Sequence, residues 1–395
     1  MVILDLVTFI LICAGILLLI PAAVLLIEIV VAVVPGKAAH VQSQSRPKIA
    51  ILVPAHDEAL VIAETLRNIS EQLSPQDRLL VIADNCTDTT AEIAEAHGAE
   101  VIRRSDSTRR GKSYALDFGI RHLSSAPPDV VIIVDADCRL VAGCLSTIGA
   151  RAFDIRRPVQ AHYELFSPVE NPSPRHGIAT FAAKVKNYLR PLGLYRLGLP
   201  CQLAGTGMAF PWDAFSKVDL NSGELTEDLV LGLDLARAGL APEFSPTARV
   251  TSHFPISAEG TKTQRARWET GHLTTISRRV PALLIEAVRK GNIPLLALTL
   301  DAAVPPLALQ AIALTAVLSA SLLALAWGAY APLAVSALAA AFFGISVVLA
   351  WRSVGRDNIT LIGLASAPAY VISKIPLYAQ ILRGKRISWI RSKRD

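Results

Sequence analysis

The sequence predicts an α/β domain with a mostly parallel, Rossmann-like sheet, flanked by membrane helices at both ends. Two observations lead to this fold class. Short apolar runs alternate with helical segments between residues 48 and 134, which is the pattern of parallel strands joined by crossover helices. Strongly apolar runs before about residue 35 and after about residue 292 raise the hydrophobic content to 52%, which is too high for an ordinary soluble domain.

These shifts in composition divide the chain into four predicted parts. Residues 1–36 form an N-terminal transmembrane anchor, and residues 47–291 form the α/β domain, which is long enough to bury its own core. Residues 292–382 form a C-terminal membrane region, and residues 383–395 form a basic cytoplasmic tail.

The N-terminal apolar run, residues 6–27, carries no charge and is long enough to cross a bilayer of about 30 Å. It is too long for the core of a signal peptide and has no basic residue before it, so we expect a retained anchor rather than a cleaved leader. Lys37, Arg46 and Lys48 follow the run, whereas Asp5 precedes it. The positive-inside rule therefore predicts a multi-pass protein of the inner membrane whose large domain is cytoplasmic.

Two further runs, residues 307–327 and 332–351, are predicted to span the membrane. A last apolar run, residues 359–382, is broken by Pro368, Lys374 and Pro376. If this run spanned, the basic tail would face outside, against the charge rule. We therefore expect an interfacial or re-entrant segment, and we expect residues 293–304 to lie along the interface as well.

The net charge of +6 suits a domain that rests on anionic lipid. Nucleic-acid binding is the alternative, but most basic residues flank apolar runs and no basic stripe is interleaved with aromatic residues, so no nucleic-acid partner is expected. The five cysteines form no CxxC pair. In a cytoplasmic domain they are predicted to be reduced thiols rather than disulfides or a zinc site.

Polar residues follow three of the predicted strands. The strands are residues 48–54, 77–83, 100–103 and 130–134, and the helices between them are residues 60–73, 90–97 and 113–123. In a parallel sheet, ligands bind beyond the carboxyl ends of the strands. His56 and Asp57 follow the first strand, Asp84 follows the second, and Asp135 with Asp137 follows the fourth. This coincidence predicts a binding site at that edge.

Asp135 and Asp137 are two residues apart at a strand end, so both carboxylates can face one ion. Oxygen ligands of this kind suit Mg²⁺ or Mn²⁺, with phosphate oxygens in the remaining positions. The alternative is an ordinary Asp that caps the next turn. For Asp84, a hydrogen bond from a nucleotide base and an Asx-turn both remain open.

Gly111, Lys112 and Ser113 resemble the end of a phosphate-binding P-loop, but Asp106 stands where that loop requires its first glycine. Lys112, at the start of a predicted helix, could still neutralise a diphosphate, as could the nearby basic run at positions 103, 104, 109 and 110. A solvated basic loop is the alternative for any one of these arginines.

Three later segments complete the candidate site. Gly205, Thr206 and Gly207 form a predicted tight turn where the backbone could approach an acceptor. Glu227 and Asp228 open the predicted helix 229–238, where acids are also common as simple caps.

Gln264, Arg267 and Trp268 lie at i, i+3 and i+4 of another predicted helix and so share one face, and His272 follows four residues later. An arginine for phosphate, an aromatic ring for a sugar and an amide fit a sugar-phosphate ligand. An amphipathic interface helix is the alternative.

Taken in order, these motifs resemble the membrane-anchored family 2 glycosyltransferases, which have the GT-A fold, and in particular the bacterial exopolysaccharide enzymes related to cellulose, chitin and hyaluronan synthases. The resemblance covers residues 48–272. It implies that Asp84 contacts the nucleotide base and that Asp135 and Asp137 hold the metal and the donor diphosphate. It also implies that Asp228 is the general base and that Gln264, Arg267 and Trp268 bind the diphosphate and the sugar.

The resemblance adds further donor-binding residues, namely Pro54, Asp57, Glu58 and Lys112, and candidate acceptor residues, namely Gly205, Thr206, Gly207, Glu227 and His272. The chain departs from the family in two places. Asp57 stands where many members have Asn before Glu, and Ala83 precedes Asp84 where many have two acids. Three predicted spans are fewer than in the channel-forming synthases.

The expected function is inverting transfer of a sugar from a nucleotide sugar, with a UDP-sugar as the expected donor and Mg²⁺ or Mn²⁺ as cofactor. The expected acceptor is linked to a polyprenyl diphosphate or is a growing polysaccharide, at the cytoplasmic face of the membrane, in exopolysaccharide or cell-envelope glycan synthesis. Two alternatives remain: a processive polysaccharide synthase, and a membrane-anchored nucleotide-binding or scaffold protein without transferase activity.

Overall fold

The computed structural model describes residues 2–36, 46–169, 173–216, 218, 226–255 and 257–383. They fall into two compact units. The sheet unit lies within residues 37–166 and 199–263, and the helical unit lies within residues 1–36, 167–198 and 264–388. Residues 264–291, which we expected in the α/β domain, thus group with the helices of the chain ends. The basic tail beyond Arg383 lies outside the described residues.

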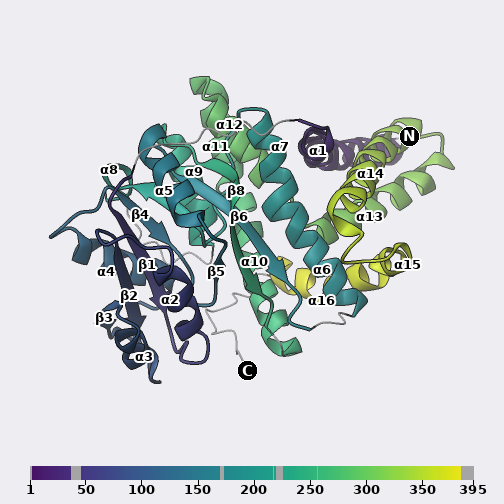
Figure 1. Ribbon diagram of the computed structural model, residues 1–395. Helices are drawn as coiled ribbons and strands as arrows, with labels where there is room; N and C mark the ends of the chain where they lie inside the picture. Colours follow the sequence, from purple (N-terminus) through teal and green to yellow (C-terminus); the bar gives the residue numbers. More distant parts are fainter. Residues whose placement is uncertain are drawn as a thin grey trace. The chain divides into compact units, whose positions relative to one another are not determined.

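The sheet unit contains one eight-stranded sheet in the order β3-β2-β1-β4-β7-β6-β8-β5 (Figure 1). β1 (Ile49–Ala55), β2 (Arg78–Asp84), β3 (Glu100–Arg104) and β4 (Val130–Ile133) are parallel neighbours. β7 (Met208–Pro211) runs antiparallel to β4 and to β6 (Val159–Phe166), which is parallel to β8 (Glu243–His253). The two-residue β5 (Arg139–Leu140) is antiparallel to β8. The predicted α/β fold with a mixed, mostly parallel sheet is confirmed.

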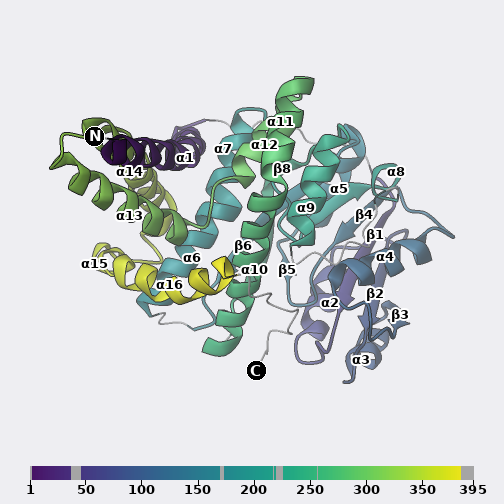
Figure 2. The same ribbon diagram turned by 180° about the vertical axis from the view of Figure 1, so that it is seen from behind.

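Helices cover both faces of this sheet, as the opposite views in Figures 1 and 2 show. α2 (Ile62–Ser70), α3 (Thr90–Ala96) and α5 (Cys144–Ile155) pack on one face, and α4 (Lys112–Leu123) and α9 (Glu227–Arg237) pack on the other. The one-turn α8 (Trp212–Phe215) follows β7. Side chains along β1 alternate between the two clusters because successive residues of a strand point to opposite faces, and all of them except the half-buried Pro54 are buried because helices cover both faces.

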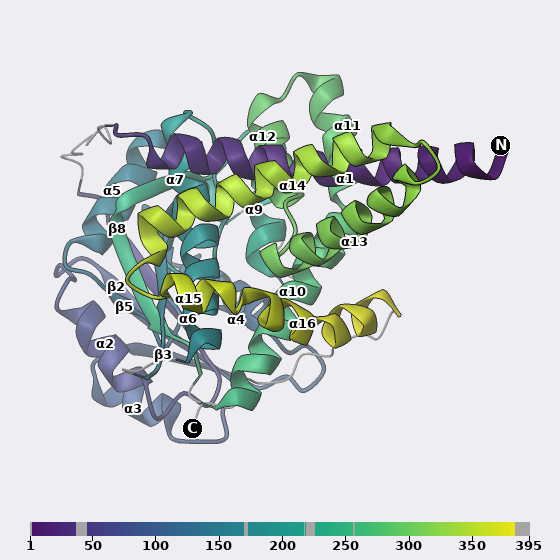
Figure 3. The same ribbon diagram turned by 90° about the vertical axis from the view of Figure 1, so that its right-hand side faces the viewer.

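The helical unit contains three helices that are long and apolar enough to cross a membrane (Figure 3). They are α1 (Val2–Val33), α13 (Leu307–Leu325) and α14 (Tyr330–Ala350), the last of which continues into the π-helix η2 (Trp351–Gly355). They coincide with the three predicted spans. The expected interfacial segment 359–382 forms α15 (Leu361–Ala365) and α16 (Ala367–Leu382), which are not among the candidate spans of the described residues.

The other helices of this unit come from further stretches of the chain. α6 (Pro174–Lys184), the π-helix η1 (Val185–Leu189) and α7 (Arg190–Arg196) form one stretch, between β6 and β7 in the sequence. α11 (Val280–Lys290) and α12 (Ile293–Ala302) form a second one, ahead of α13. α10 (Ala258–Arg278) begins in the sheet unit and continues in the helical unit from residue 264.

α7 packs directly on the backbone of α1. A Cβ atom added to Gly193 would lie 2.0 Å from the carbonyl oxygen of Glu28, so no other residue fits at this position. Arg190 is buried between two acids: its Nε donates to Glu28 at 2.8 Å and its Nη2 donates to Asp301 at 2.5 Å. Asp301, which interrupts the apolar run 293–304, therefore has a charged partner inside the unit.

Arg196 joins the same two helices at the carboxyl end of α1. The last carbonyl groups of a helix have no partner within it. The Nη1 atom of Arg196 donates to the carbonyl oxygens of Val31, Ala32 and Val34 at 3.0, 2.7 and 2.5 Å. A cation at this end also complements the helix dipole, so Arg196 terminates α1 from a position far away in the sequence.

Candidate active site

The candidate site lies at the edge of the sheet where β1, β2 and β4 end. Because β7 is antiparallel to β4, the turn before β7 starts at the same edge. Gly207 N donates to the carbonyl of Ile133 at 2.9 Å, and Asp135 N donates to Thr206 Oγ1 at 3.1 Å. The predicted turn 205–207 is therefore held against the end of β4, next to the predicted metal ligands.

Two carboxylates and a thiol converge just after β4. Asp135, Asp137 and Cys138 each offer one ligand atom, and these atoms lie within 4.8 Å of one another, so the group could hold a metal ion. Burial, with Asp137 and Asp135 nearby, raises the pKa of the Cys138 thiol well above its ordinary value. Cys138 thus stays protonated, and the carboxylates of Asp135 and Asp137 are the ligands that fit, which favours Mg²⁺ or Mn²⁺ over a soft metal.

A serine from the far part of the sheet orients the second acid. Ser252 Oγ, on β8, donates to Asp137 Oδ2 at 2.9 Å. This hydrogen bond leaves the other oxygen of the carboxylate, Oδ1, within reach of the Cys138 thiol at 3.7 Å. Residues that support a ligand in this way commonly fix its orientation.

Lys112 brings a positive charge into this acidic cluster. It opens α4 directly after Gly111, whose φ of 130° favours glycine. Its Nζ donates to a carboxylate oxygen of Asp135 and to the carbonyl of Gly205, the latter at 2.6 Å. Burial by itself would lower the pKa of Lys112, but Asp135, Glu227 and Asp228 raise it above its ordinary value. The ammonium is therefore charged at neutral pH.

Glu227 and Asp228 begin α9, and the negative charges of both side chains act on Lys112. Asp228 Oδ1 accepts a hydrogen bond from Leu229 N at 2.8 Å, and Oδ2 lies 3.3 Å from where a Cβ on Gly205 would stand. Burial raises the pKa of Glu227 to about 7, with Asp228 adding to the rise and Lys112 opposing it. The structure thus brings together five predicted site residues: Lys112, Asp135, Gly205, Glu227 and Asp228.

Asp84 ends β2 and is buried, with 6% of its surface exposed. Its Oδ1 accepts hydrogen bonds from Arg104 Nη1 at 2.6 Å and from Asn85 Nδ2 at 2.9 Å. Burial raises the pKa of Asp84, and Arg104 partly opposes that rise. Arg104, which we considered for the diphosphate, is instead the partner of Asp84, and Arg103 pairs with Glu92 and Glu95.

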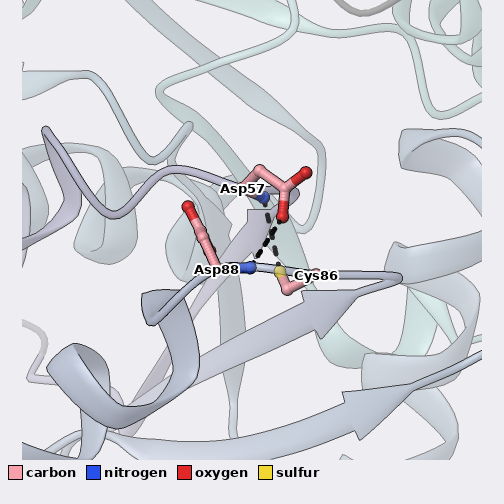
Figure 4. A group of neighbouring side chains, drawn as sticks. All are labelled: Asp57, Cys86 and Asp88. Atoms are coloured by element: carbon pink, nitrogen blue, oxygen red, sulfur yellow. Dashed lines mark hydrogen bonds between the residues drawn. The ribbon is translucent and has the colours of Figure 1, made fainter.

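Asp57 ties the loop after β1 to the loop after β2 (Figure 4). Its Oδ1 accepts from the backbone amides of Thr87 at 2.6 Å and Asp88 at 3.2 Å, and its own amide donates to Cys86 Sγ at 3.4 Å. Burial would raise the pKa of Asp57, but these hydrogen bonds lower it. Although Asp57, Cys86 and Asp88 also lie within metal-ligating range of one another, these bonds give Asp57 a structural role.

Two more residues expected to bind the donor lie next to Asp57. Glu58 N donates to Thr90 Oγ1 at 2.7 Å, which joins the loop to the start of α3. Pro54 is half-buried near the end of β1.

The predicted residues on α10 belong to the helical unit. Gln264 is 8% exposed, and Arg267 and Trp268 are half-buried. His272 Nε2 donates to the carbonyl of Ala302 at 2.9 Å, and burial, with Lys186 nearby, lowers the pKa of His272 to about 4. His272 is therefore a neutral, packed residue near neutral pH.

α16 is fastened to the same stretch of α10. Lys374 Nζ donates to Glu269 Oε1 at 2.7 Å, with only 11% and 17% of the two side chains exposed. Arg265 Nη1 donates to the hydroxyl of Tyr370 at 3.2 Å. On its other side α16 exposes apolar residues, including Ile372 and Ile375. This pattern is that of an amphipathic helix.

Sequence reasoning missed the residues that support the site from neighbouring strands. Besides Arg104 and Ser252, these include Gln160 on β6, which donates to the carbonyl of Thr206 at 2.9 Å and accepts from Ala204 N at 2.8 Å. No local pattern marks them, because each acts on a residue that is distant in the sequence. The one usable signal was the arginine at the end of the strand next to β2, which is Arg104.

Comparison with known proteins agrees with this geometry. The model of the family described as glycosyltransferase like family 2 matches residues 47–271. A probable glycosyltransferase, YdaM, of Bacillus subtilis is 34% identical over 99 residues, which are 23% of this chain and 23% of that protein. A 4,4'-diaponeurosporenoate glycosyltransferase of Staphylococcus haemolyticus is 26% identical over 148 residues, 35% of this chain and 38% of that protein. The alignments thus span well under half of these relatives.

The mannosyltransferase PcManGT of Pyrobaculum calidifontis, solved with GDP-Man and Mn²⁺, shares the fold. It superposes with a TM-score of 0.59 at 19% identity, over 97% of this chain and 100% of that one. Because the family model covers more than half of the chain, the chain belongs to glycosyltransferase family 2.

Proposed function

We propose that the protein is an inverting glycosyltransferase that moves a sugar from a nucleotide sugar to a lipid-linked or growing glycan acceptor at the cytoplasmic face of the membrane. The observation that carries this proposal is the cluster at the end of β4, in which Lys112 bridges Asp135 and Gly205 beside Glu227 and Asp228. It combines a place for a metal diphosphate with a carboxylate that can act as a base.

The donor end of the site is built from charges of both signs. Asp135 and Asp137 would hold Mg²⁺ or Mn²⁺, and this ion supplies positive charge to the departing diphosphate when it is bound. Lys112 adds a second positive charge, and we propose Arg267 as a further partner of the diphosphate, because the resemblance of Gln264, Arg267 and Trp268 to the family implies it. Asp84 would accept a hydrogen bond from the base of the donor, for which we propose a UDP-sugar. Pro54, Asp57 and Glu58 shape the loop beside it, and Gln264 and Trp268 contact the sugar.

The chemical step needs one base and one leaving group. Asp228 takes the proton of the acceptor hydroxyl, and the acceptor oxygen forms a bond to the anomeric carbon. The bond from that carbon to the phosphate oxygen breaks on the opposite side, and its electron pair leaves with the nucleoside diphosphate, which inverts the centre. Glu227, with a pKa of about 7, holds a proton at slightly acidic pH, which removes its negative charge from beside Asp228.

A lipid-linked acceptor fits the helical unit. Three of its helices are long and apolar enough to span a bilayer, and they belong to the same chain as the transfer site. The relative from Staphylococcus haemolyticus is named for 4,4'-diaponeurosporenoate. We propose a polyprenyl-diphosphate-linked acceptor of exopolysaccharide or envelope glycan synthesis, with the turn 205–207 and His272 as candidate acceptor residues. A processive synthase is the second candidate.

The experiment uses the full-length protein in lipid nanodiscs. A panel of nucleotide sugars is screened with Mn²⁺, Mg²⁺ or EDTA for release of nucleoside diphosphate, first without and then with polyprenyl-diphosphate-linked acceptors or soluble sugars. We expect metal-dependent release that lipid-linked acceptors stimulate, and a single added sugar on the product. Long products would favour the processive synthase. Transfer to soluble sugars alone would exclude the lipid-linked acceptor, and no release from any donor would leave only nucleotide binding.

A further inference from the structure

The pairing of Arg104 with Asp84 limits what the Asp84 carboxylate can offer to a ligand. Arg104 Nη1 and Asn85 Nδ2 both donate to Oδ1, at 2.6 and 2.9 Å. Among the described contacts, Oδ2 accepts no hydrogen bond. A carboxylate can otherwise accept two parallel hydrogen bonds, one on each oxygen. In this protein, hydrogen bonds from Arg104 and Asn85 occupy Oδ1 of Asp84.

The guanidinium of Arg104 is fixed in this position. It is 9% exposed, and its Nη2 donates to Asp106 Oδ2 at 3.2 Å and to the carbonyl of Arg109 at 2.8 Å. Its guanidinium carbon lies 5.7 Å from the centre of the Tyr114 ring. The backbone adds to this, because Asn85 N donates to the carbonyl of Arg104 at 2.7 Å. Arg104 is therefore held from several sides, and turning it away from Asp84 would break these contacts together.

The edge that faces a base thus consists of one acceptor, Oδ2, beside the remaining N–H groups of an arginine. Uracil and thymine match this edge in either orientation, because their one ring N–H lies between two carbonyl groups. Guanine has a carbonyl on one side of its ring N–H and an amine on the other. Its amine would either lose its partner or meet the N–H groups of Arg104. Cytosine has no proton on the corresponding ring nitrogen, so it meets Oδ2 with a second acceptor.

We propose that Arg104 sets the base specificity of the donor site, by occupying one oxygen of Asp84 so that the other selects uracil or thymine over guanine and cytosine. This inference rests on the proposed use of a nucleotide sugar and on the contact of Asp84 with the base. It assigns to Arg104 a role in specificity that the motif order alone does not contain. A donor carrying a uracil or thymine nucleotide follows from it.

The first test measures nucleotide binding without any transfer. Full-length protein in nanodiscs is titrated calorimetrically with UDP, TDP, GDP and CDP in the presence of Mn²⁺. We expect UDP and TDP to bind with similar affinity and at least about tenfold more tightly than GDP and CDP, which corresponds to one buried hydrogen bond. UDP methylated at N3 should lose a similar factor. Equal binding of UDP and GDP, or unimpaired binding of N3-methyl-UDP, would overturn the inference.

The second test changes Arg104 itself. Arg104→Met and Arg104→Gln each remove the arginine from Oδ1 of Asp84, which keeps only the hydrogen bond from Asn85 Nδ2, and we expect the ratio of GDP to UDP affinity to rise about tenfold. Arg103→Met is the matched control: Arg103 precedes Arg104 on the same strand but pairs with the exposed Glu92 and Glu95, so the ratio should not change. An unchanged ratio in folded Arg104 variants would sink the proposal.

The outcomes separate this inference from the proposed function. If the wild-type protein binds no nucleoside diphosphate, both fall together. If it binds and uses UDP- and GDP-sugars equally well, the transferase function stands and the role of Arg104 falls. Should both Arg104 variants fail to fold, the wild-type series with N3-methyl-UDP still decides the question.

Discussion

Lys112 and Asp135 are joined by a hydrogen bond, and the same ammonium also reaches the carbonyl of Gly205 at 2.6 Å. A positive charge thus stands beside a proposed metal ligand. We expect Lys112→Met to bind Mn²⁺ alone several-fold more tightly, because a competing cation is removed. It should bind UDP with Mn²⁺ at least about tenfold more weakly, because the diphosphate loses a charged hydrogen bond.

The measurement for Lys112→Met is calorimetric titration with Mn²⁺ and then with UDP. Arg110→Met, which removes an exposed charge from the same basic run, is the control and should change neither affinity appreciably. If both affinities fell in Lys112→Met, Lys112 would be a structural support of the acids rather than a partner of the diphosphate.

Ser252→Ala should weaken metal binding without touching a ligand. The serine hydroxyl orients Asp137 through a 2.9 Å hydrogen bond, and loss of such a supporting contact commonly costs about 10–100-fold in metal affinity. Asp137→Ala should abolish metal-dependent nucleotide binding outright, and EDTA should reproduce this in the wild type. Titration with Mn²⁺ followed by paramagnetic resonance gives the affinities. Wild-type affinity in Ser252→Ala would show that Asp137 is oriented by its backbone alone.

Asp228→Asn should abolish transfer while leaving nucleotide binding nearly intact. Loss of a general base typically lowers the rate by about 10²–10⁴-fold. The test compares the rate of transfer with the dissociation constant of UDP and Mn²⁺ in the same preparation. Full turnover by this variant would remove Asp228 from its role.

Glu227→Gln should instead alter the dependence of transfer on pH. The raised pKa of Glu227, about 7, means that the carboxyl is protonated at pH 6 and largely ionised at pH 8. Gln imitates the protonated form of Glu227 at every pH. The change in the rate of transfer that the titration of Glu227 causes near pH 7 should therefore be absent in the variant. A variant as inactive as Asp228→Asn would indicate that Glu227 is itself the base.

Lys374→Met should destabilise the protein and weaken donor use together. It removes the hydrogen bond between the charged groups of Lys374 and the largely buried Glu269, at a cost of about 2 kcal/mol. It also loosens α16 from the helix that carries Gln264, Arg267 and Trp268. We expect a lower melting temperature and a higher KM for the donor, and partial recovery in the charge exchange Lys374→Glu with Glu269→Lys. Lys290→Met, at an exposed pair with Glu286, should change neither quantity. A lowered melting temperature with an unchanged KM would limit α16 to a structural role.

His272→Gln should reduce the loss of stability in acid. The folded protein lowers the pKa of His272 to about 4, from an ordinary value of about 6.5. As the pH falls through 6.5, the unfolded chain takes up a proton that the folded chain refuses until about pH 4, so this group lowers stability progressively in that window. The melting temperature should therefore fall less between pH 7.5 and 5 in the variant. An equal fall would show that His272 titrates normally.

Features set by neighbouring residues were predictable from the sequence. A buried apolar run followed by a carboxylate is a local pattern, and it correctly placed Asp84 and Asp135 at the ends of two strands that flank β1. The three spans were predictable because length and hydropathy alone define them. The fold class followed from the same alternation of runs.

The remaining features depend on contacts between distant positions. Ser252 lies 115 residues from Asp137, and Gln160 lies 46 residues from Thr206, so no local pattern links either pair. The antiparallel pairing of β7 with β4, which brings the turn 205–207 to the site, likewise leaves no periodic signal. The sequence identified Arg104 as a basic residue near the site. It could not show that Arg104 pairs with Asp84 rather than with a phosphate, because that pairing depends on the side-by-side placement of β2 and β3.

The contact between Gly193 and Glu28 has a consequence for how the protein is made. α1 needs Arg190 and Arg196 to satisfy its buried acid and its last carbonyl groups, and these residues are synthesised about 160 positions later. Until they emerge, the buried acid and the carboxyl end of α1 lack these partners. α1 is therefore a packed part of the helical unit. A shortened version without residues 1–36 would expose Arg190, Arg196 and the backbone of Gly193. We expect this version to aggregate rather than yield a soluble enzyme.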